Sequence, residues 1–239
     1  MSRRFLVKVC GQTNAEDAAV AASCGADFLG FIFHPSSPRC VTPQQAAAIP
    51  TGLCRRVGVF VRTEVREIAE IARTARLDLL QLHGPYSAQD AAFLGPERII
   101  RVLWPEKTPI ESLQAQIDAW APFCAYYLTD AGSAAASGGL GRCLDVASLD
   151  RLRFPHPWFL AGGLSPSNLP QLLSLCHPNG IDLNSGVELS PGRKDPTALR
   201  AVFGLPLVGK IPAESPIRLC CPLLMGANKD RPSGGEGRS

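Results

Sequence analysis

The stretch FLVKVCG, residues Phe5 to Gly11, decides how the rest of the chain is interpreted. It is a short apolar run with β-branched and aromatic side chains, which predicts a buried strand. The strand ends at Cys10, and a helix-like segment follows. A reactive side chain at the carboxyl end of a parallel strand is typical of α/β-barrel active sites. The alternative is that Cys10 is a small buried hydrophobe, a common role for free cysteine.

The same alternation of strand and helix recurs along most of the chain. The predicted strands are Phe5–Cys10, Asp27–Phe33, Arg56–Val61, Leu77–Leu82, Ile99–Leu103, Tyr126–Asp130, Trp158–Ala161 and Gly180–Asn184. The predicted helices are Ala15–Ser23, Pro43–Ile49, Glu64–Arg76, Ser87–Leu94, Ile110–Trp120, Val146–Leu152, Ser165–Leu175 and Pro196–Phe203. Continuous apolar strands indicate burial on both faces, as in parallel sheets. Eight such units favour an α/β fold of the (β/α)8 TIM-barrel type, with a doubly wound sheet as the alternative.

Two of the predicted helices begin with a capping residue followed by proline. These starts are Ser165-Pro166 and Asp195-Pro196. Serine and aspartate are favoured N-caps, and proline is favoured at the first helical position. We therefore expect helices to begin at both sites.

Length and composition fit one soluble domain of barrel size, or two small domains. The chain has 239 residues, of which 46% are hydrophobic and 19% charged, and we assign 1–204 to the barrel. Residues 205–239 are expected to form a C-terminal extension that is at least partly disordered. The net charge of +3 is too weak to indicate binding to nucleic acid or a membrane surface. The sequence shows neither a membrane span of ~20 apolar residues nor a signal peptide.

The cysteines predict a reducing compartment. There are nine, an odd number, and most lie in apolar surroundings, which is not a disulfide framework at this length. No Cys-x-x-Cys pair or histidine cluster offers a metal site. We therefore expect a cytoplasmic protein without a bound metal.

Polar residues and glycines collect where the predicted strands end. In a barrel, all of these ends lie on one rim around one pocket. The residues concerned are Cys10-Gly11, His34–Arg39, His83-Gly84, Asp130–Gly132, Gly162–Leu164 and Asn184–Glu188. This rim is where we expect the functional site.

The glycine loops after the last two strands predict a phosphate site. Gly162 and Gly163 follow the seventh strand, and Ser185 and Gly186 follow the eighth. Backbone N–H groups approach an anion closely where no Cβ intervenes, and these loops form the usual phosphate site of TIM barrels. Tight turns are the alternative, but a further glycine-rich run at 138–141 favours phosphate.

A thiol and a carboxylate on this rim suggest acid–base chemistry. Asp130 ends an apolar strand, where a carboxylate is typically a cap or a working acid. Cys10 as a thiolate is a candidate base. Lys8 alternates with valines in the first strand, so it either points into the barrel beside Cys10 or forms an ion pair at the rim.

Two further rim residues have open roles. Arg39 follows a loop with two prolines, and its forked guanidinium suits a carboxylate, with a solvated surface arginine as the alternative. His83 either bonds a substrate or satisfies a neighbouring carbonyl group.

From about Phe5 to Phe203, the order and spacing of several motifs resemble the phosphoribosylanthranilate isomerase family. The motifs are Val7-Lys8-Val9-Cys10-Gly11 with Thr13, Gln81-Leu82-His83-Gly84, Asp130 with a downstream Gly-Gly-x-Gly, Leu160–Leu164 with Pro166 and Asn168, and Asp182-x-Asn184-Ser185-Gly186-Val187-Glu188 with Pro191-Gly192-x-Lys194-Asp195. The chain departs from the family after the sixth strand, where Leu140 replaces a threonine.

The resemblance implies a (β/α)8 barrel that catalyses an Amadori rearrangement in tryptophan synthesis. The substrate would be N-(5′-phosphoribosyl)anthranilate, used without metal or organic cofactor by a monomer or homodimer. Cys10 matches the general base, Asp130 the general acid and Arg39 the residue that holds the anthranilate carboxylate. Lys8, His83 and Asp182 are expected as possible substrate contacts.

Three other functions are considered from the residues. A ribulose-phosphate epimerase needs metal ligands at the strand ends, and His83 alone does not supply them. An indole-glycerol-phosphate synthase needs catalytic lysines and a glutamate at the strand ends, where only Lys8 qualifies. A non-catalytic phosphate-binding barrel would keep the glycine loops but would have no need for both Cys10 and Asp130.

Overall fold

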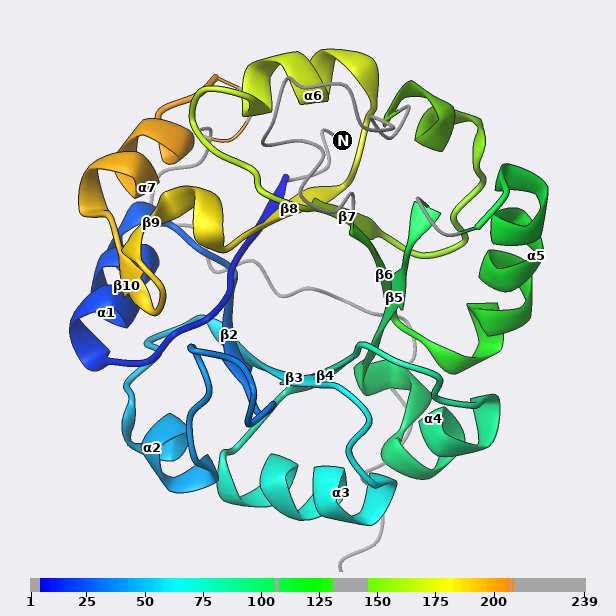
Figure 1. Ribbon diagram of the computed structural model, residues 1–239, viewed down its shortest axis with the longest axis horizontal. Coiled ribbons are helices and arrows are strands. Elements are labelled where there is room, and N and C mark those ends of the chain that lie inside the picture. The colour runs from blue at the N-terminus through cyan, green and yellow to red at the C-terminus, as the bar shows by residue number, and fades with distance from the viewer. Residues whose placement is uncertain (1–4, 106–107, 131–145, 207, 209–239) are drawn as a thin grey trace, which may run out of the picture.

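A closed barrel of parallel strands forms the centre of the molecule. The computed structural model describes residues 5–105, 108–130, 146–206 and 208. Figure 1 shows the ring of strands with helices around its outside, and each strand pairs in parallel with the next until β8 closes on β1. The strands are β1 (Leu6–Val9), β2 (Phe28–Ile32), β3 (Arg55–Phe60), β4 (Leu79–Leu82), β5 (Ile99–Leu103), β6 (Tyr126–Asp130), β7 (Trp158–Ala161) and β8 (Gly180–Leu183). The predicted TIM barrel is confirmed, and the doubly wound sheet is wrong.

Helices cover the outside of this barrel. The α-helices are α1 (Ala15–Cys24), α2 (Pro43–Ala48), α3 (Val65–Thr74), α4 (Ala88–Leu94), α5 (Ile110–Trp120), α6 (Leu169–Leu175) and α7 (Pro196–Phe203). Short 3₁₀ helices are η1 (Pro96–Arg98), η3 (Ala121–Phe123), η5 (Val146–Arg151) and η6 (Ser185–Val187). The outer core forms where helix faces meet the outward strand residues, as Ile68 and Ala72 of α3 do.

The helix predictions are right in position, with two differences. The predicted helix Val146–Leu152 is the 3₁₀ helix η5. Asp195 caps α7 as expected, accepting a hydrogen bond from the amide of Thr197 (2.8 Å). The helix expected from Ser165 begins only at Leu169, because Asn168 accepts a hydrogen bond from the Ser165 amide (2.8 Å) and residues 165–168 form a turn.

The barrel interior has an apolar end and a polar end. At the amino ends of the strands, Phe28 meets Tyr126 and Phe159 edge to face, with ring centroids 6.0 and 5.6 Å apart. These rings belong to an apolar cluster that fills this end of the barrel. Toward the carboxyl ends, the buried residues Lys8 and Asp182 replace apolar side chains.

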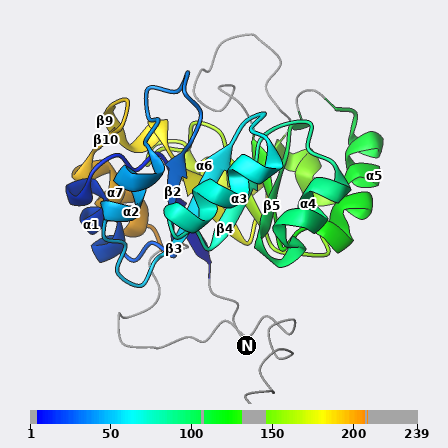
Figure 2. The same ribbon diagram turned by 90° about the horizontal axis from the view of Figure 1, so that it is seen from below.

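An antiparallel hairpin follows η6 and was not predicted. It consists of β9 (Glu188–Ser190) and β10 (Arg193–Lys194). In the side view of Figure 2 it lies at the upper end of the barrel, opposite the end where the described chain begins. The amide of Lys194 donates to Asp17 of α1 (2.8 Å), which fixes the hairpin against the first helix.

The boundaries of the predicted extension are only partly described. Helix α7 ends at Phe203 and completes the barrel. Leu205 and Val208 pack against the outer core. The rest of 205–239, like the glycine-rich run at 138–141, lies outside the described residues. In the described part of the chain, no helix is long and apolar enough to cross a membrane.

Candidate active site

Cys10 lies at the mouth of the barrel directly after β1. Its amide donates to the carbonyl of Leu183 in β8 (2.8 Å), and its side chain is only 4% exposed. The thiol belongs to a small cluster with Ile32 and Val59. A Cβ on Gly30 of β2 would lie 2.8 Å from Sγ, so this glycine leaves the space that the thiol occupies. The thiol thus has a fixed position inside the barrel.

Lys8 and Asp182 form a buried ion pair next to this thiol. Their Cα atoms pair in register between β1 and β8, and Nζ of Lys8 lies 2.8 and 2.7 Å from the two carboxylate oxygens. Burial alone would lower the pKa of Lys8, but the Asp182 carboxylate and Cys10 raise it above its usual value. Burial raises the pKa of the Cys10 thiol, and the Lys8 ammonium opposes that rise. Lys8 therefore points into the barrel, and its ion pair is internal instead of lying at the rim.

Asp130 faces the same end of the interior from β6. It is the last residue of that strand, pairs in register with Ala161 of β7 and is half-buried. The Asp130 and Asp182 carboxyl groups are close enough to repel each other, and the charge of Asp182 also acts on Cys10. Asp182 of β8, Cys10 after β1 and Asp130 at the end of β6 therefore lie at the same end of the barrel interior.

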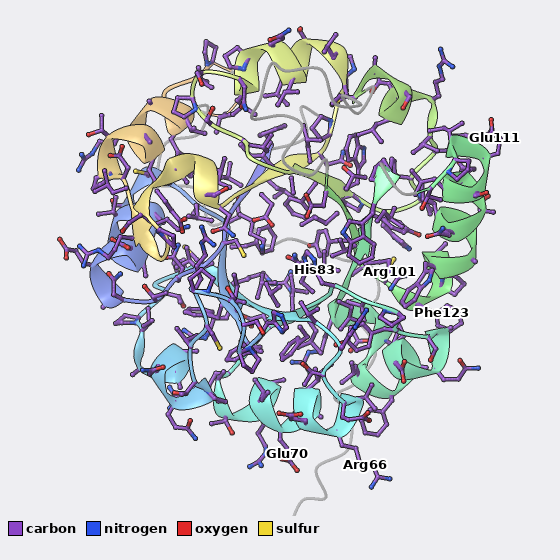
Figure 3. All side chains as sticks on the ribbon, in the orientation of Figure 1. Arg66, Glu70, His83, Arg101, Glu111 and Phe123 are labelled. Atoms are coloured by element: carbon purple, nitrogen blue, oxygen red, sulfur yellow. The ribbon has the colours of Figure 1, made fainter. Side chains whose placement is uncertain are left out.

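His83 points into the centre of the barrel and is uncharged. Figure 3 shows it near the barrel centre, whereas Arg101 lies further out toward α5. Nε2 of His83 is in hydrogen-bond contact with the carboxamide of Gln81, and its ring lies edge-on to Trp104 with centroids 6.0 Å apart. Burial lowers the pKa of His83 to about 3, and the charges of Lys8 and Arg101 act in the same direction. His83 is therefore a neutral hydrogen-bonding group.

Arg39 is held at the rim by a carboxylate and is not a freely solvated side chain. Its Nε lies 3.0 Å from both carboxylate oxygens of Glu188, and its Nη2 lies 2.5 Å from Oε2. Glu188 also accepts from Nζ of Lys194 (2.7 Å). A Cβ on Gly11, the residue after Cys10, would lie 2.8 Å from Cδ of Arg39, so this cluster adjoins the segment that carries the thiol.

The two predicted glycine loops lie against each other. Gly162 and Gly163 both have positive φ, 107° and 61°, a conformation that favours glycine. A Cβ on Gly186, in η6, would lie 2.0 Å from the carbonyl oxygen of Leu164. Only a glycine permits this backbone approach, which brings the loop containing Ser185 onto the loop after β7.

The sequence interpretation missed three residues of the site. Gly30 reads as an ordinary strand residue, and only the pairing of β1 with β2 shows that it faces Cys10. Glu188 and Lys194 stand in the quoted motifs but had no assigned role. The sequence signal that could have identified Glu188 and Lys194 is the presence of two charged residues in a short segment that contains glycine and proline.

The assembled groups suit acid–base chemistry on an anionic substrate. A thiol and a carboxyl group lie at one end of the barrel interior, a half-buried guanidinium lies at the rim, and two glycine loops follow β7 and β8. Proton transfer needs an acid and a base within reach of the same reacting atoms. Glycine N–H groups and a guanidinium are suited to bind phosphate and carboxylate.

Comparison with known proteins identifies the family. Residues 7–204 match the family model of N-(5′-phosphoribosyl)anthranilate (PRA) isomerase. The N-(5′-phosphoribosyl)anthranilate isomerase of Desulfovibrio desulfuricans is 48% identical over 202 residues, covering 84% of this chain and 95% of the relative.

Solved structures give the same match. Phosphoribosyl anthranilate isomerase from Thermotoga maritima superposes with a TM-score of 0.70 at 30% identity, covering 83% of this chain and 97% of that chain. Another phosphoribosyl anthranilate isomerase, in complex with reduced 1-(o-carboxyphenylamino)-1-deoxyribulose 5-phosphate, has a TM-score of 0.66 at 30% identity, covering 82% and 95%. The chain belongs to the N-(5′-phosphoribosyl)anthranilate isomerase family, whose enzymes serve tryptophan biosynthesis.

Proposed function

We propose that this chain converts N-(5′-phosphoribosyl)anthranilate to 1-(2-carboxyphenylamino)-1-deoxyribulose 5-phosphate, with Cys10 as general base and Asp130 as general acid. The observation that carries the assignment of roles is the placement of these two groups at the same end of the barrel interior, Cys10 directly after β1 and Asp130 at the end of β6. The family match supports the reaction, and the ligand of the related structure supports the class of substrate.

In the first step Asp130, in its acid form, donates a proton to the furanose ring oxygen. The bond between C1′ and this oxygen breaks, and the lone pair of the anthranilate nitrogen forms the C1′=N bond of a Schiff base. The position of Asp130 at the end of β6, at the same end of the barrel interior as Cys10, supports this role.

In the second step the Cys10 thiolate removes the proton from C2′. The electrons of the broken C–H bond form C1′=C2′, and those of C1′=N return to nitrogen. The resulting enolamine gains a proton at C1′ and loses one from its 2′-hydroxyl, which gives the ketone. Cys10 then releases its proton and Asp130 takes one up, so the protons balance. Burial makes the thiolate a stronger base, and Lys8 stabilises its charge.

The substrate is bound at its two charged ends in this proposal. Arg39 holds the anthranilate carboxylate, and backbone N–H groups around Gly162, Gly163, Ser185 and Gly186 hold the phosphate. The positive φ angles after β7 and the close approach of Gly186 support the phosphate site. Between these ends Lys8, His83 and Asp182 contact the ribose.

The proposal places the enzyme in the cytoplasm, acting as a monomer or a homodimer. Among the described cysteines, Cys10, Cys24, Cys40, Cys124 and Cys176 are free thiols. Free thiols in this number support a reducing compartment.

Turnover of N-(5′-phosphoribosyl)anthranilate, followed by loss of its fluorescence, tests the proposal. Cys10→Ala and Asp130→Asn should each lower kcat by about a hundredfold to ten-thousandfold, because each removes one proton transfer. Their melting temperatures show whether the barrel remains folded. Near-wild-type turnover in either variant would remove that residue from its role, and a folded wild-type protein without turnover would favour a phosphate-binding barrel.

A further inference from the structure

The β9–β10 hairpin brings two charged side chains to Arg39 from the last part of the barrel. Glu188 and Lys194 are Cα partners across the two strands, and their side chains meet at 2.7 Å. Their side chains are 3% and 1% exposed. A buried charge is costly unless it is paired and hydrogen-bonded. This cluster of buried charges therefore needs a structural or a functional explanation.

Glu188 binds one particular edge of the Arg39 guanidinium. Its carboxylate accepts from Nε and Nη2, the side edge of the planar group. The end edge, formed by Nη1 and the other Nη2 hydrogen, is directed away from Glu188 because the five N–H groups are fixed in a plane. Arg39 can therefore keep its contact with Glu188 while a second carboxylate binds its end edge.

The charges of this cluster do not cancel. Arg39 and Lys194 are cationic, and Glu188 is the single anion joined to them by these ion pairs. Burial would raise the pKa of Glu188, but the hydrogen bonds from Arg39 and Lys194 lower it below its usual value, so Glu188 stays ionised. One net positive charge remains, and one substrate carboxylate would balance it.

Backbone contacts on several sides hold the cluster rigidly. Thr13 donates its hydroxyl to the carbonyl of Gly192 at the turn of the hairpin (2.6 Å), and the Gly192 amide faces Glu188 (3.3 Å). Gly11, with φ of 74°, lies so close that a Cβ would be 2.8 Å from Cδ of Arg39. The guanidinium is thus fixed at its stem and along one edge before any ligand binds.

We propose that Glu188 and Lys194 are positioning residues that hold Arg39 with its end edge open to the substrate carboxylate. This role rests on the proposed binding of that carboxylate by Arg39. Lys194 completes the arrangement because its Nζ also binds Oδ1 of Asn184 (3.1 Å), which fixes Glu188 relative to the end of β8.

Steady-state kinetics of Glu188→Gln test the inference. The amide keeps the size of the side chain but loses its charge and one acceptor, so the side edge of Arg39 is held less firmly. The KM for N-(5′-phosphoribosyl)anthranilate should rise about tenfold to a hundredfold, with a much smaller change in kcat. The inhibition constant of ribose 5-phosphate, which carries a phosphate and no carboxylate, should not change.

A double-mutant cycle with Arg39→Ala identifies the route of the effect. If Glu188 acts through Arg39, Glu188→Gln should have no further effect on KM in the Arg39→Ala background. An unchanged KM in Arg39→Ala alone would refute the carboxylate assignment of the proposed function. A raised KM in Arg39→Ala together with an unchanged KM in Glu188→Gln would overturn only the positioning role.

Two further variants separate positioning from stability. Glu188→Gln/Lys194→Met removes one charge of each sign, so it should recover the melting temperature lost by Glu188→Gln while KM stays high. Recovery of KM in this double variant would overturn the inference. A KM below the wild-type value in Glu188→Gln would also overturn it, because that result would mean that Glu188 competes with the substrate carboxylate for Arg39. Glu16→Gln is the control, because Glu16 pairs with Arg193 of the same hairpin at 3.8 Å in an exposed position. It should leave KM unchanged.

Discussion

Replacing Gly30 with alanine should displace the Cys10 thiol without removing it. A Cβ at this position would lie 2.8 Å from Sγ and 3.0 Å from Cα of Cys10. Ordinary van der Waals contact begins near 3.4 Å, so Sγ must move by about 0.6 Å and the Cys10 backbone by about 0.4 Å. Gly30 belongs to β2, which is paired on both sides, so much of the movement falls on Cys10.

The expected losses of stability and of kcat follow from this displacement. Overpacking a barrel interior by one methyl group should reduce the free energy of unfolding by about 1 to 3 kcal/mol. A reacting group moved by a sizeable fraction of an ångström should lower kcat by about tenfold to a hundredfold. The KM should change less, because Arg39 and the glycine loops are untouched.

Gly58→Ala is the matched control for this prediction. Gly58 is also a strand glycine, in β3, but it faces outward, where a Cβ would lie 2.3 Å from Cδ1 of Leu77 and 2.7 Å from Cε2 of Phe60. The substitution should lower the melting temperature at least as much as Gly30→Ala while kcat stays near the wild-type value. Fluorescence turnover and thermal unfolding of both variants provide the comparison. Equal losses of kcat, or a wild-type kcat in Gly30→Ala, would refute the reasoning.

Buried ionisable side chains give three more predictions. Because burial raises the pKa of the Cys10 thiol, kcat/KM should increase with pH and continue to increase above pH 9, and a pH profile that is flat above pH 7 would contradict this expectation. Since the pKa of His83 is about 3, His83→Asn should leave the shape of that profile unchanged between pH 5 and 9. Burial raises the pKa of Cys124 and Cys176 from 9.0 to about 12, so the unfolded state loses these protons at a lower pH than the folded state does. The free energy of unfolding, measured with urea, should therefore fall between pH 9 and 12 by about 1.4 kcal/mol per pH unit for each thiol. Lys8→Met leaves its carboxylate partner buried and unpaired, and urea unfolding should show a loss of about 3 to 5 kcal/mol.

The sequence predicted the fold because each strand carries its own local signal. The apolar run ending at Cys10 and the similar run ending at Asp130 are short, continuous and followed by polar residues, which is the pattern of parallel strands buried on both faces. Local signals also predicted the cap at Asp195. The predicted start of α6 was wrong because the side chain of Asn168 accepts a hydrogen bond from the amide of Ser165, the expected capping residue.

The partners within the site were not predictable, because they come from distant parts of the chain. Arg39 and Glu188 are 149 residues apart, and Lys8 and Asp182 are 174 apart. The sequence placed Arg39 and Glu188 on the rim and gave Lys8 and Asp182 as possible substrate contacts, but it did not indicate which charges meet. The space that Gly30 leaves for the thiol likewise depends on the pairing of β1 with β2, which no local pattern encodes.

Strand register distinguishes a closed charge pair from a cluster that can bind an anion. Lys8 and Asp182 are in register between two parallel strands of the barrel, and their charges balance, so a further ion has little to gain there. Glu188 and Lys194 are in register between the antiparallel strands of the hairpin, and alone they would be equally balanced. Arg39, arriving from the loop after β2, adds the uncompensated charge. Because a buried excess charge is costly until a partner neutralises it, we expect the substrate carboxylate to bind at the cluster that contains Arg39.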